Sequence, residues 1–390
     1  MSMVSRKEYL HTMRKRYQQC RCRAERSKII DELVAVLGYH RKYAITALNR
    51  SEGNRVKRQR RPRALKYREA MPAVQLVWEA LDYACAERLH PVLVETAEIL
   101  AHHGEIFLTP LIREHLACIS RTTLGRRISS WSLEPAGRAT PRPKPSSSIK
   151  REVPVQSYAW NEQQPGALEC DLVEHNGGSS HGHYAYTLSV VDVVSGFSRR
   201  RSVLGRGRAG VLAELDLIIT DWLHRPWGLH TDNGSEFLND HLVAYTKDKN
   251  LQFTRSRPYK KNDSPHVEQK NRQYVRDIVG YERYDSLEAV QWLNEVYRIL
   301  DPYANYCLPM RKLIGKVRQG SRVKKTYDQA QTPFKRLVET GVLDPQHQHQ
   351  LLEYAQSLNP LAINRHLRQL LTLGPSRYQL HPPREAANDD

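Results

Sequence analysis

Three acidic residues have the surroundings that metal-dependent chemistry requires. Asp232 lies in His-Thr-Asp-Asn-Gly-Ser-Glu-Phe (230–237), and Glu268 lies in Asn-Asp-Ser-Pro-His-Val-Glu-Gln-Lys-Asn (262–271), with 35 residues between them. Asp171 stands upstream in an apolar run that predicts a buried strand, where an unpaired carboxylate would be costly. Carboxylates suit Mg²⁺ or Mn²⁺, and two such ions can assist an in-line displacement at phosphorus. The sequence therefore predicts a divalent-metal site that acts on nucleic acid.

The order of elements around these acids indicates an α/β core. Apolar and helical periodicities predict strands at 167–173, 184–194, 198–204, 227–231 and 251–255, and helices at 209–224, 235–250 and 266–280. This is the order of a ribonuclease-H-like fold, which we expect over residues 161–306. Taken singly, each acid has an ordinary interpretation: a turn, a partner of an arginine, or a solvated helix residue. Their combination in this order favours a catalytic site.

The N-terminal region, residues 1–64, has the pattern of a helix-turn-helix. Ser27 can cap a helix that Gly38 ends, and a second helix follows from about His40. The apolar residues expected to point inward are Ile30, Leu33, Val34, Leu37, Ala44, Ile45 and Leu48. The residues expected to face DNA are Arg41, Lys42 and Thr46. The alternative is an ordinary helical hairpin, but the basic run 55–63 that follows favours DNA binding.

Three further regions complete the expected organisation. Residues 65–131 predict a second helical block, in which Ser120 caps a short basic helix carrying Arg126 and Arg127. That helix suits a second DNA-binding motif and a plain packing helix equally well. Residues 132–160 predict a basic linker rich in proline and serine. Residues 307–390 predict a small basic element followed by a helical tail suited to self-association.

Charge and composition support a nucleic-acid partner. The net charge of +18 is divided into +15 over residues 1–160, −3 over 161–310 and +6 over 311–390. Basic flanks around a mildly acidic core concentrate at polyanions. We expect no membrane span, a reducing compartment for the six scattered cysteines, and a cytoplasmic, nucleoid-associated protein. A zinc site at Cys20 and Cys22 is disfavoured because no second ligand pair has a usual spacing.

Basic and amide residues near the acids are expected to hold DNA. Lys260 and Lys261 lie in a loop at the mouth of the site. On the helix that carries Glu268, the expected DNA contacts are Lys270, Asn271 and Arg272. His181 and His183 are interpreted as loop residues rather than metal ligands, because paired imidazoles alone are weak evidence.

Two segments resemble a known family. Residues 230–237 and 258–271 closely resemble the integrase catalytic core of DDE insertion-sequence transposases, which are related to retroviral integrases. Residues 38–44 (Gly-Tyr-His-Arg-Lys-Tyr-Ala) are similar to the N-terminal helix-turn-helix of a bacterial branch of those transposases, and the similarity extends to the segment 320–328. The chain departs from retroviral integrases in lacking their His-His-Cys-Cys zinc module, so binding of transposon ends is expected to rest on the helix-turn-helix region.

The resemblance implies a function. It makes Asp171, Asp232 and Glu268 a catalytic triad that binds two Mg²⁺ or Mn²⁺ ions. The implied reaction is metal-dependent nicking at transposon ends, followed by attack of the freed 3′-hydroxyl on target DNA. The implied partners are double-stranded DNA and further copies of the chain. Two alternatives stay open: a catalytically silent DNA-binding regulator with the same fold, and a nuclease that does not join strands.

Overall fold

The structure is a computed structural model that describes residues 3–49, 66–131, 164–231, 240–255, 265–320 and 322–375. The chain divides into two compact units, Met1–Lys66 and Tyr67–Asp390. We describe each unit by itself. Among the described residues, no helix combines the length and apolar character needed to cross a bilayer.

The first unit is a group of three helices, α1 (Met3–Gln19), α2 (Arg23–Leu37) and α3 (Arg41–Leu48). Gly38 ends α2 at a φ of +69°, and its N–H donates to the Val34 carbonyl. The His40 side chain then accepts from the Lys42 N–H and caps α3. A small apolar core holds the helices together and consists of Met13, Ile29, Ile30, Leu33, Leu37, Ala44 and Leu48.

Two details of this unit differ from expectation. Ser27 does not cap α2, because the helix already begins at Arg23 and continues through residues with good helix propensity. The Ser27 hydroxyl instead accepts a hydrogen bond from Arg41. Ile45 lies at the surface, and Ala47 takes the inward position that Ile45 was expected to fill.

The second unit is built on a five-stranded mixed sheet with the order β3-β2-β1-β4-β5. The strands match the expected runs, and their bounds are β1 Ala167–Glu174, β2 Ala185–Asp192, β3 Ser198–Leu204, β4 Gly228–Thr231 and β5 Gln252–Arg255. The first three strands form an antiparallel meander, whereas β4 and β5 run parallel to β1. The carboxyl ends of β1, β4 and β5 therefore meet at one edge of the sheet.

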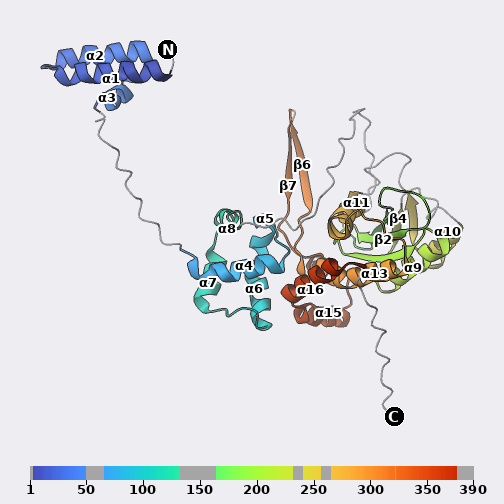
Figure 1. Ribbon diagram of the computed structural model, residues 1–390. Coiled ribbons are helices and arrows are strands. Elements are labelled where there is room, and N and C mark those ends of the chain that lie inside the picture. The colour runs from blue at the N-terminus through green and yellow to red at the C-terminus, as the bar shows by residue number, and fades with distance from the viewer. Residues whose placement is uncertain are drawn as a thin grey trace. The chain divides into compact units, whose positions relative to one another are not determined.

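Helices cover both faces of this sheet (Figure 1). One face carries Leu168, Cys170, Leu188 and Val190 and packs with α9 (Arg208–Thr220) in an apolar core. The helix α10 (Asp240–Asp248) contributes Leu242 to the same apolar core. The opposite face packs against α11 (Pro265–Asn271) and α13 (Leu287–Pro302). Between them lie a π-helical turn, η3 (Arg272–Arg276), and the short α12 (Asp277–Val279).

The face toward α13 is polar, although it is buried. Thr187 and the Tyr297 hydroxyl are hydrogen-bonded at 2.9 Å, and the Asn294 amide oxygen accepts from the Ser202 N–H at 2.7 Å. Buried Arg200 pairs with Asp301 on the same helix. These polar groups of the strands thus find partners on the helix, which offsets the cost of burying them. These bonds fix α13 over the meander.

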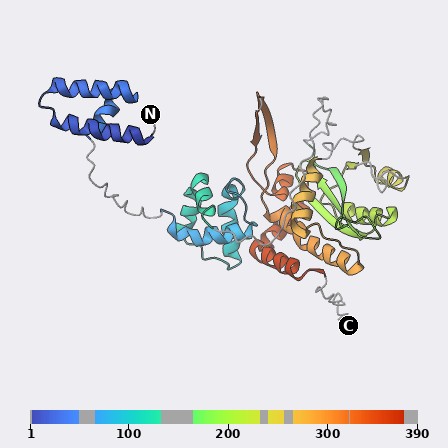
Figure 2. The ribbon, with the colours of Figure 1, turned by 45° about the horizontal axis from the view of Figure 1, so that its top comes forward.

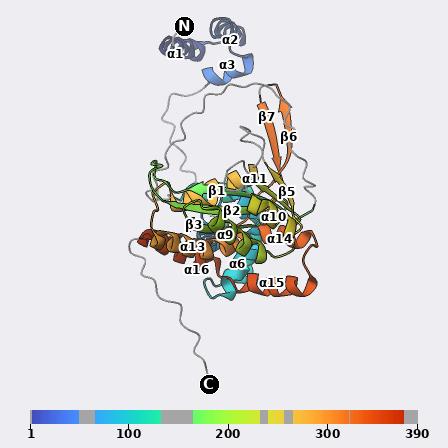
Figure 3. The ribbon, with the colours of Figure 1, turned by 90° about the vertical axis from the view of Figure 1, so that its right-hand side faces the viewer.

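A helical block, a ribbon and a helical tail complete the second unit (Figures 2 and 3). The block contains η1 (Arg68–Ala70), α4 (Met71–Ala80), α5 (Ala86–Leu89), η2 (His90–Val92), α6 (Leu93–His102), α7 (Pro110–Cys118) and α8 (Arg121–Ile128). After a second π-helical turn, η4 (Tyr303–Cys307), the chain forms β6 (Leu313–Gln319), β7 (Arg322–Tyr327), α14 (Pro333–Glu339), α15 (Pro345–Ser357) and α16 (Pro360–Leu373).

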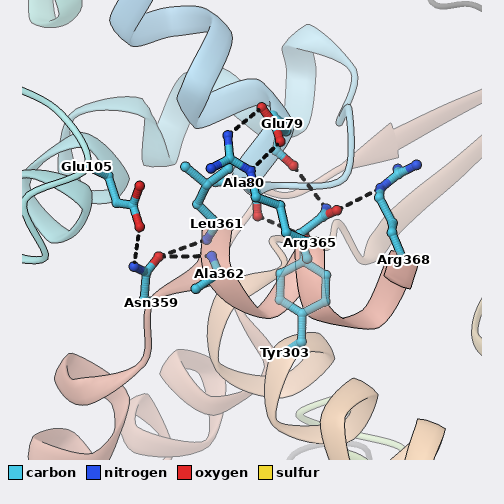
Figure 4. Close-up of polar contacts among 10 residues, drawn as sticks. Glu79, Ala80, Glu105, Tyr303, Asn359, Leu361, Ala362, Arg365 and Arg368 are labelled. Carbon is cyan, nitrogen blue, oxygen red and sulfur yellow. Dashed lines mark hydrogen bonds and ion pairs between the residues drawn. The ribbon is translucent and has the colours of Figure 1, made fainter. Parts of the chain in front are cut away.

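The helix α16 joins the helical block to the core. Asn364 donates hydrogen bonds to the Glu79 carbonyl and the Tyr303 hydroxyl, and Arg365 pairs with the Glu79 carboxylate. Figure 4 shows the pair of Arg365 with Glu79, with Arg368 nearby. The Arg368 guanidinium also pairs with Asp82. The tail was expected to be helical and to support self-association. Within the described chain, α16 packs against α4 and α13, and the expected role of the tail in self-association stays a prediction.

Candidate active site

Asp171 lies half-buried near the carboxyl end of β1, between β2 and β4. One carboxylate oxygen accepts from the Leu172 N–H at 2.9 Å. The other accepts from the Asn271 side-chain amide at 2.8 Å. Asn271 is the last residue of α11, one turn beyond Glu268. The hydrogen bond therefore ties the first expected acid to the helix that carries another.

Glu268 is exposed in the first turn of α11, a helix that packs on β1 and β2. A buried acid, Glu169, fixes the start of this helix. Its carboxylate accepts from the backbone N–H groups of His266 at 3.0 Å and Val267 at 2.9 Å. These N–H groups have no partner within the helix, so the carboxylate satisfies them and complements the helix dipole. Glu169 and Asp171 share one face of β1, so one strand anchors both ends of α11.

Asp232 lies outside the described residues. The last described residue before it is Thr231, at the end of β4. Thr231 is paired with Cys170, the residue that precedes Asp171.

The pKa of Glu169 reflects both its burial and its acidic neighbours. Burial raises the pKa of Glu169 to about 7, although the two backbone N–H donors act in the opposite direction. The negative charges of Glu268 and Asp171 raise this pKa further. A divalent cation would relieve such an accumulation of carboxylates.

The donor set suits a hard cation in part. Asp171 and Glu268 offer carboxylate oxygens, which Mg²⁺ and Mn²⁺ prefer. Beside them, the buried amide oxygen of Asn271 has no hydrogen-bond partner. In the part of the chain that the structure describes, no group of three acidic, histidine or cysteine side chains gathers as a metal site. The third expected acid, Asp232, is outside that part.

Two of the expected DNA contacts on α11 are corrected by the structure. Lys270 is only 4% exposed and Asn271 only 7%. The Lys270 ammonium lies 4.8 Å from the Tyr274 ring centre and 3.5 Å from the Met310 sulfur. Lys270 lies two positions beyond the exposed Glu268, so its side chain points to the other side of the helix. Asn271 is buried because its amide bonds the Asp171 carboxylate on β1. Arg272 is exposed, as a DNA contact requires.

The other expected DNA contacts occupy varied positions. Lys42 and Thr46 are exposed on α3, whereas Arg41 pairs with Asp31. On α8, the Ser120 hydroxyl accepts from the Thr123 N–H and caps the helix as expected. Arg126 of that helix is exposed and Arg127 is half-buried. Lys260 and Lys261 lie outside the described residues.

The histidines of the loop after β1 make no metal cluster in the described chain. Arg283 donates hydrogen bonds to the carbonyls of Ser179, His181 and His183 and so closes the loop on itself. A side chain at Gly177 would lie 2.7 Å from the Arg283 Cβ, which explains the glycine there. The two histidines are exposed loop residues.

Sequence reasoning missed Glu169 and the structural role of Asn271. A signal for Glu169 was present, because a second acid two positions before Asp171 lies on the same face of an expected buried strand. The hydrogen-bond partners of Glu169 could not be predicted from the sequence, since the N–H groups that it binds lie 97 and 98 residues away.

Comparisons with known proteins give one close relative. No family model matches the chain. The uncharacterized protein y4rM of Sinorhizobium fredii (strain NBRC 101917 / NGR234) is 36% identical over 338 residues, which cover 86% of this chain and 96% of y4rM. The chain belongs to the same family as y4rM. Among solved structures, the catalytic core domain of BIV integrase is similar at 15% identity with a TM-score of 0.30, over 44% of this chain and 95% of that one. That likeness is too distant to carry a residue role.

Proposed function

We propose that the protein is a DDE transposase, a metal-dependent enzyme that cuts DNA strands at transposon ends and joins them to target DNA. The observation that carries this proposal is the attachment of α11 to β1. Glu169 binds the first turn of α11 and Asn271 binds Asp171, so the strand and the helix present Asp171 and Glu268 at one place.

Asp171, Asp232 and Glu268 are the proposed ligands of two Mg²⁺ or Mn²⁺ ions. Asp232 directly follows Thr231, and the pairing of Thr231 with Cys170 supports a position beside Asp171. When bound, the ions would supply an activated nucleophile and stabilise the leaving oxygen. The chain's own residues orient the ligands: Asn271 holds the Asp171 carboxylate, and Glu169 holds the helix of Glu268.

The architecture supports a ribonuclease-H-like catalytic core. An antiparallel meander joined to two parallel strands in the order β3-β2-β1-β4-β5 is the arrangement expected of such cores. In open sheets of this kind, sites form beyond the carboxyl ends of the parallel strands. Asp171 stands there, one position past the last β1–β4 pair.

Other regions are proposed to bring DNA to the core. In the first unit, α2 and α3 form the proposed helix-turn-helix, with Lys42 and Thr46 at its exposed surface. On α8, Arg126 offers a second basic contact. Near the site, Arg272 and the lysines Lys260 and Lys261 are proposed to hold phosphates. Because two ends must be handled together, we propose that several copies assemble on DNA.

A plasmid assay tests this function. The full chain is incubated with supercoiled DNA, labelled terminal-repeat duplexes and Mg²⁺, and then with EDTA in place of Mg²⁺. We expect strand-transfer products that depend on the metal. Asp171→Asn, Asp232→Asn and Glu268→Gln should each lower product formation by a factor of at least 10³, with end binding retained. Lys247→Gln, at an exposed position of α10, is the matched control.

The outcomes separate the alternatives. Nicking without joining would identify a nuclease. End binding without any cleavage, unchanged in the three variants, would identify a DNA-binding regulator. Native activity in any of the three variants would show that the metal ligands are wrongly assigned.

A further inference from the structure

The strands β6 and β7 form a two-stranded antiparallel ribbon that stands clear of the rest of its unit in all three views (Figures 1, 2 and 3). Among the described residues, no third strand pairs with it. Nearly all of its residues are exposed, including the apolar side chains of Ile314, Val317 and Val323 at 65%, 54% and 52%. The ribbon thus presents both of its faces outward.

The charge of the ribbon has a single sign. Residues 311–327 contain seven lysines and arginines and no acidic residue. Four of these cations are exposed on the strands themselves: Lys316, Arg318, Lys324 and Lys325. In the described part of the chain, none of the four makes an ion pair with a carboxylate, and Arg318 donates only to the Gly320 carbonyl.

The strand register places like charges together. Lys316 is directly opposite Lys325, and Val317 is opposite Lys324. Like charges in directly opposed positions destabilise a strand pair, and a lone two-stranded hairpin is marginal in water. Lysines also keep exposed strand edges from aggregating, but that purpose leaves the exposed Ile314, Val317 and Val323 unexplained. A polyanionic partner would remove the repulsion and give the apolar side chains a surface to contact.

The base of the ribbon is fixed beside the candidate site. The Lys312 ammonium donates to the carbonyls of Val193 at 3.0 Å and Val194 at 2.6 Å, in the turn between β2 and β3. At the other strand, Asp328 binds the Lys312 N–H and pairs with buried Arg336. Met310, just before the ribbon, touches Lys270 of α11. A partner held by the ribbon would therefore lie next to the helix that carries Glu268.

We propose that the β6–β7 ribbon binds duplex DNA by entering its major groove beside the candidate active site. The major groove admits a two-stranded ribbon, and the lysines and arginines on both faces can reach the two phosphate backbones that border it. Val323, on the same face as Arg318 and Lys325, is suited to contact base edges such as thymine methyl groups. The inference rests on DNA as the substrate, but it concerns binding and not chemistry.

A binding experiment tests the ribbon. Fluorescence anisotropy measures the affinity of the full chain for a 30-base-pair DNA duplex in EDTA, at several salt concentrations. The ribbon variant is Lys316→Gln/Arg318→Gln/Lys324→Gln/Lys325→Gln. The control variant removes the same charge at exposed positions elsewhere: Arg206→Gln/Arg208→Gln/Arg225→Gln/Lys247→Gln. Because EDTA prevents metal chemistry, the result does not depend on the proposed catalytic residues.

We expect the ribbon variant to bind DNA at least tenfold more weakly at about 0.1 M salt. The slope of log affinity against log salt concentration should become smaller by about three to four, since each phosphate contact contributes about 0.9 to that slope. The affinity of the control variant for the DNA duplex should stay within about twofold of the wild-type affinity. An RNA duplex of the same sequence should be bound equally by the wild type and the ribbon variant, because the A-form major groove is too narrow for the ribbon. Thermal unfolding should match the wild type, which shows that the variant folds.

Three results would overturn the proposal. Equal weakening in both variants would mean a general charge effect. Greater weakening on RNA would identify RNA as the partner. A change in the molar mass of the free protein, with DNA affinity intact, would show that the ribbon contacts a second copy of the chain.

Discussion

At the scale of single residues, the site depends on Glu169, a side chain that binds no expected substrate. Its carboxylate receives the first N–H groups of α11 and thereby sets the position of Glu268 relative to β1. Asn271 closes the other end of the same helix on Asp171. A short hydrogen-bonded frame thus holds the strand of Asp171 and the helix of Glu268 in a fixed relation, as precise catalytic geometry requires.

Replacing Glu169 tests this frame. Glu169→Ala removes the carboxylate that accepts from the N–H groups of His266 and Val267. The change should cost about 1–2 kcal/mol in the free energy of unfolding, the usual cost of a lost cap. The Mg²⁺ concentration needed for half-maximal nicking should rise as Glu268 loses its position. Glu169→Gln is the control, because its amide oxygen can still accept both bonds. Equal metal dependence in the alanine variant and the wild type would exclude a positioning role.

Lys270 offers a pH-dependent test. Burial lowers its pKa to about 7, and the nearby Arg200 adds to the effect. The unfolded chain keeps the proton to about pH 10, so unfolding takes up a proton between about pH 7 and 10, and stability rises with pH across that window. Lys270→Met should therefore be more stable than the wild type by on the order of 2–4 kcal/mol at pH 6.5, with the difference shrinking toward pH 10.

Urea unfolding at pH 6.5 and pH 9.5 measures this difference for Lys270→Met. The exposed Lys247 supplies the control, because Lys247→Met should change stability little at either pH. A stability difference for Lys270→Met that is the same at both pH values would mean that this lysine is not charged at a cost in the native state.

At the scale of elements, α16 links α4 of the helical block to η4 through hydrogen bonds. Asn364 is buried and donates both of its amide hydrogens, one to the Glu79 carbonyl at 2.9 Å and one to the Tyr303 hydroxyl at 2.8 Å. The Tyr303 hydroxyl in turn donates to the Ala80 carbonyl (Figure 4). The end of α4 is thus bonded to α16 and to η4 through one polar cluster.

Asn364→Ala should loosen this junction. It removes the amide that donates to the Glu79 carbonyl and the Tyr303 hydroxyl. These groups keep only the Asp82 N–H and the Ala80 carbonyl as partners, and we expect a loss of about 2–3 kcal/mol in the free energy of unfolding. Arg365→Gln, which removes the exposed pair with the Glu79 carboxylate, should cost no more than about 1 kcal/mol. Chemical denaturation of the full chain measures both. Equal losses in the two variants would argue against Asn364 as the main link.

At the scale of the whole molecule, the chain consists of two units with separate apolar cores. Among the described residues, the buried core of the first unit contains residues from Met13 to Leu48, and the two buried cores of the second unit contain residues from Ala70 to Leu370. Each unit therefore buries its own apolar surface, which is the condition for independent folding. This separation agrees with the proposed division of labour, in which the first unit recognises DNA and the second carries the chemistry.

Removal of the first unit tests that division. A chain of residues 67–390 should keep the unfolding temperature of the second unit and a metal-dependent nicking activity on plasmid DNA. It should lose its preference for terminal-repeat duplexes over random duplexes, because the proposed helix-turn-helix is gone. Calorimetry and competition binding measure the two effects. A shortened chain that still selects terminal repeats would place recognition in the second unit, with α8 as the first element to examine.

The sequence by itself determined the strands of the five-stranded sheet. Alternation of apolar residues fixed the strands of the sheet within one or two positions, since the side chains of a buried strand must be apolar on the face that packs. The motifs around Asp232 and Glu268, together with Asp171, marked the acids, and the capping residue Ser120 marked α8. These signals are local, so periodicity and residue type suffice to find them.

Only the tertiary structure decided which side chains face the site. Lys270 and Asn271 have residue types that suit DNA, but the rotation of α11 on the sheet buries them. Glu169 gains its role from N–H groups almost a hundred residues away. The basic run near residue 320 became a ribbon fixed beside α11, rather than an unplaced charged segment. Such contacts join distant parts of the chain, and no local pattern in a single sequence specifies their register.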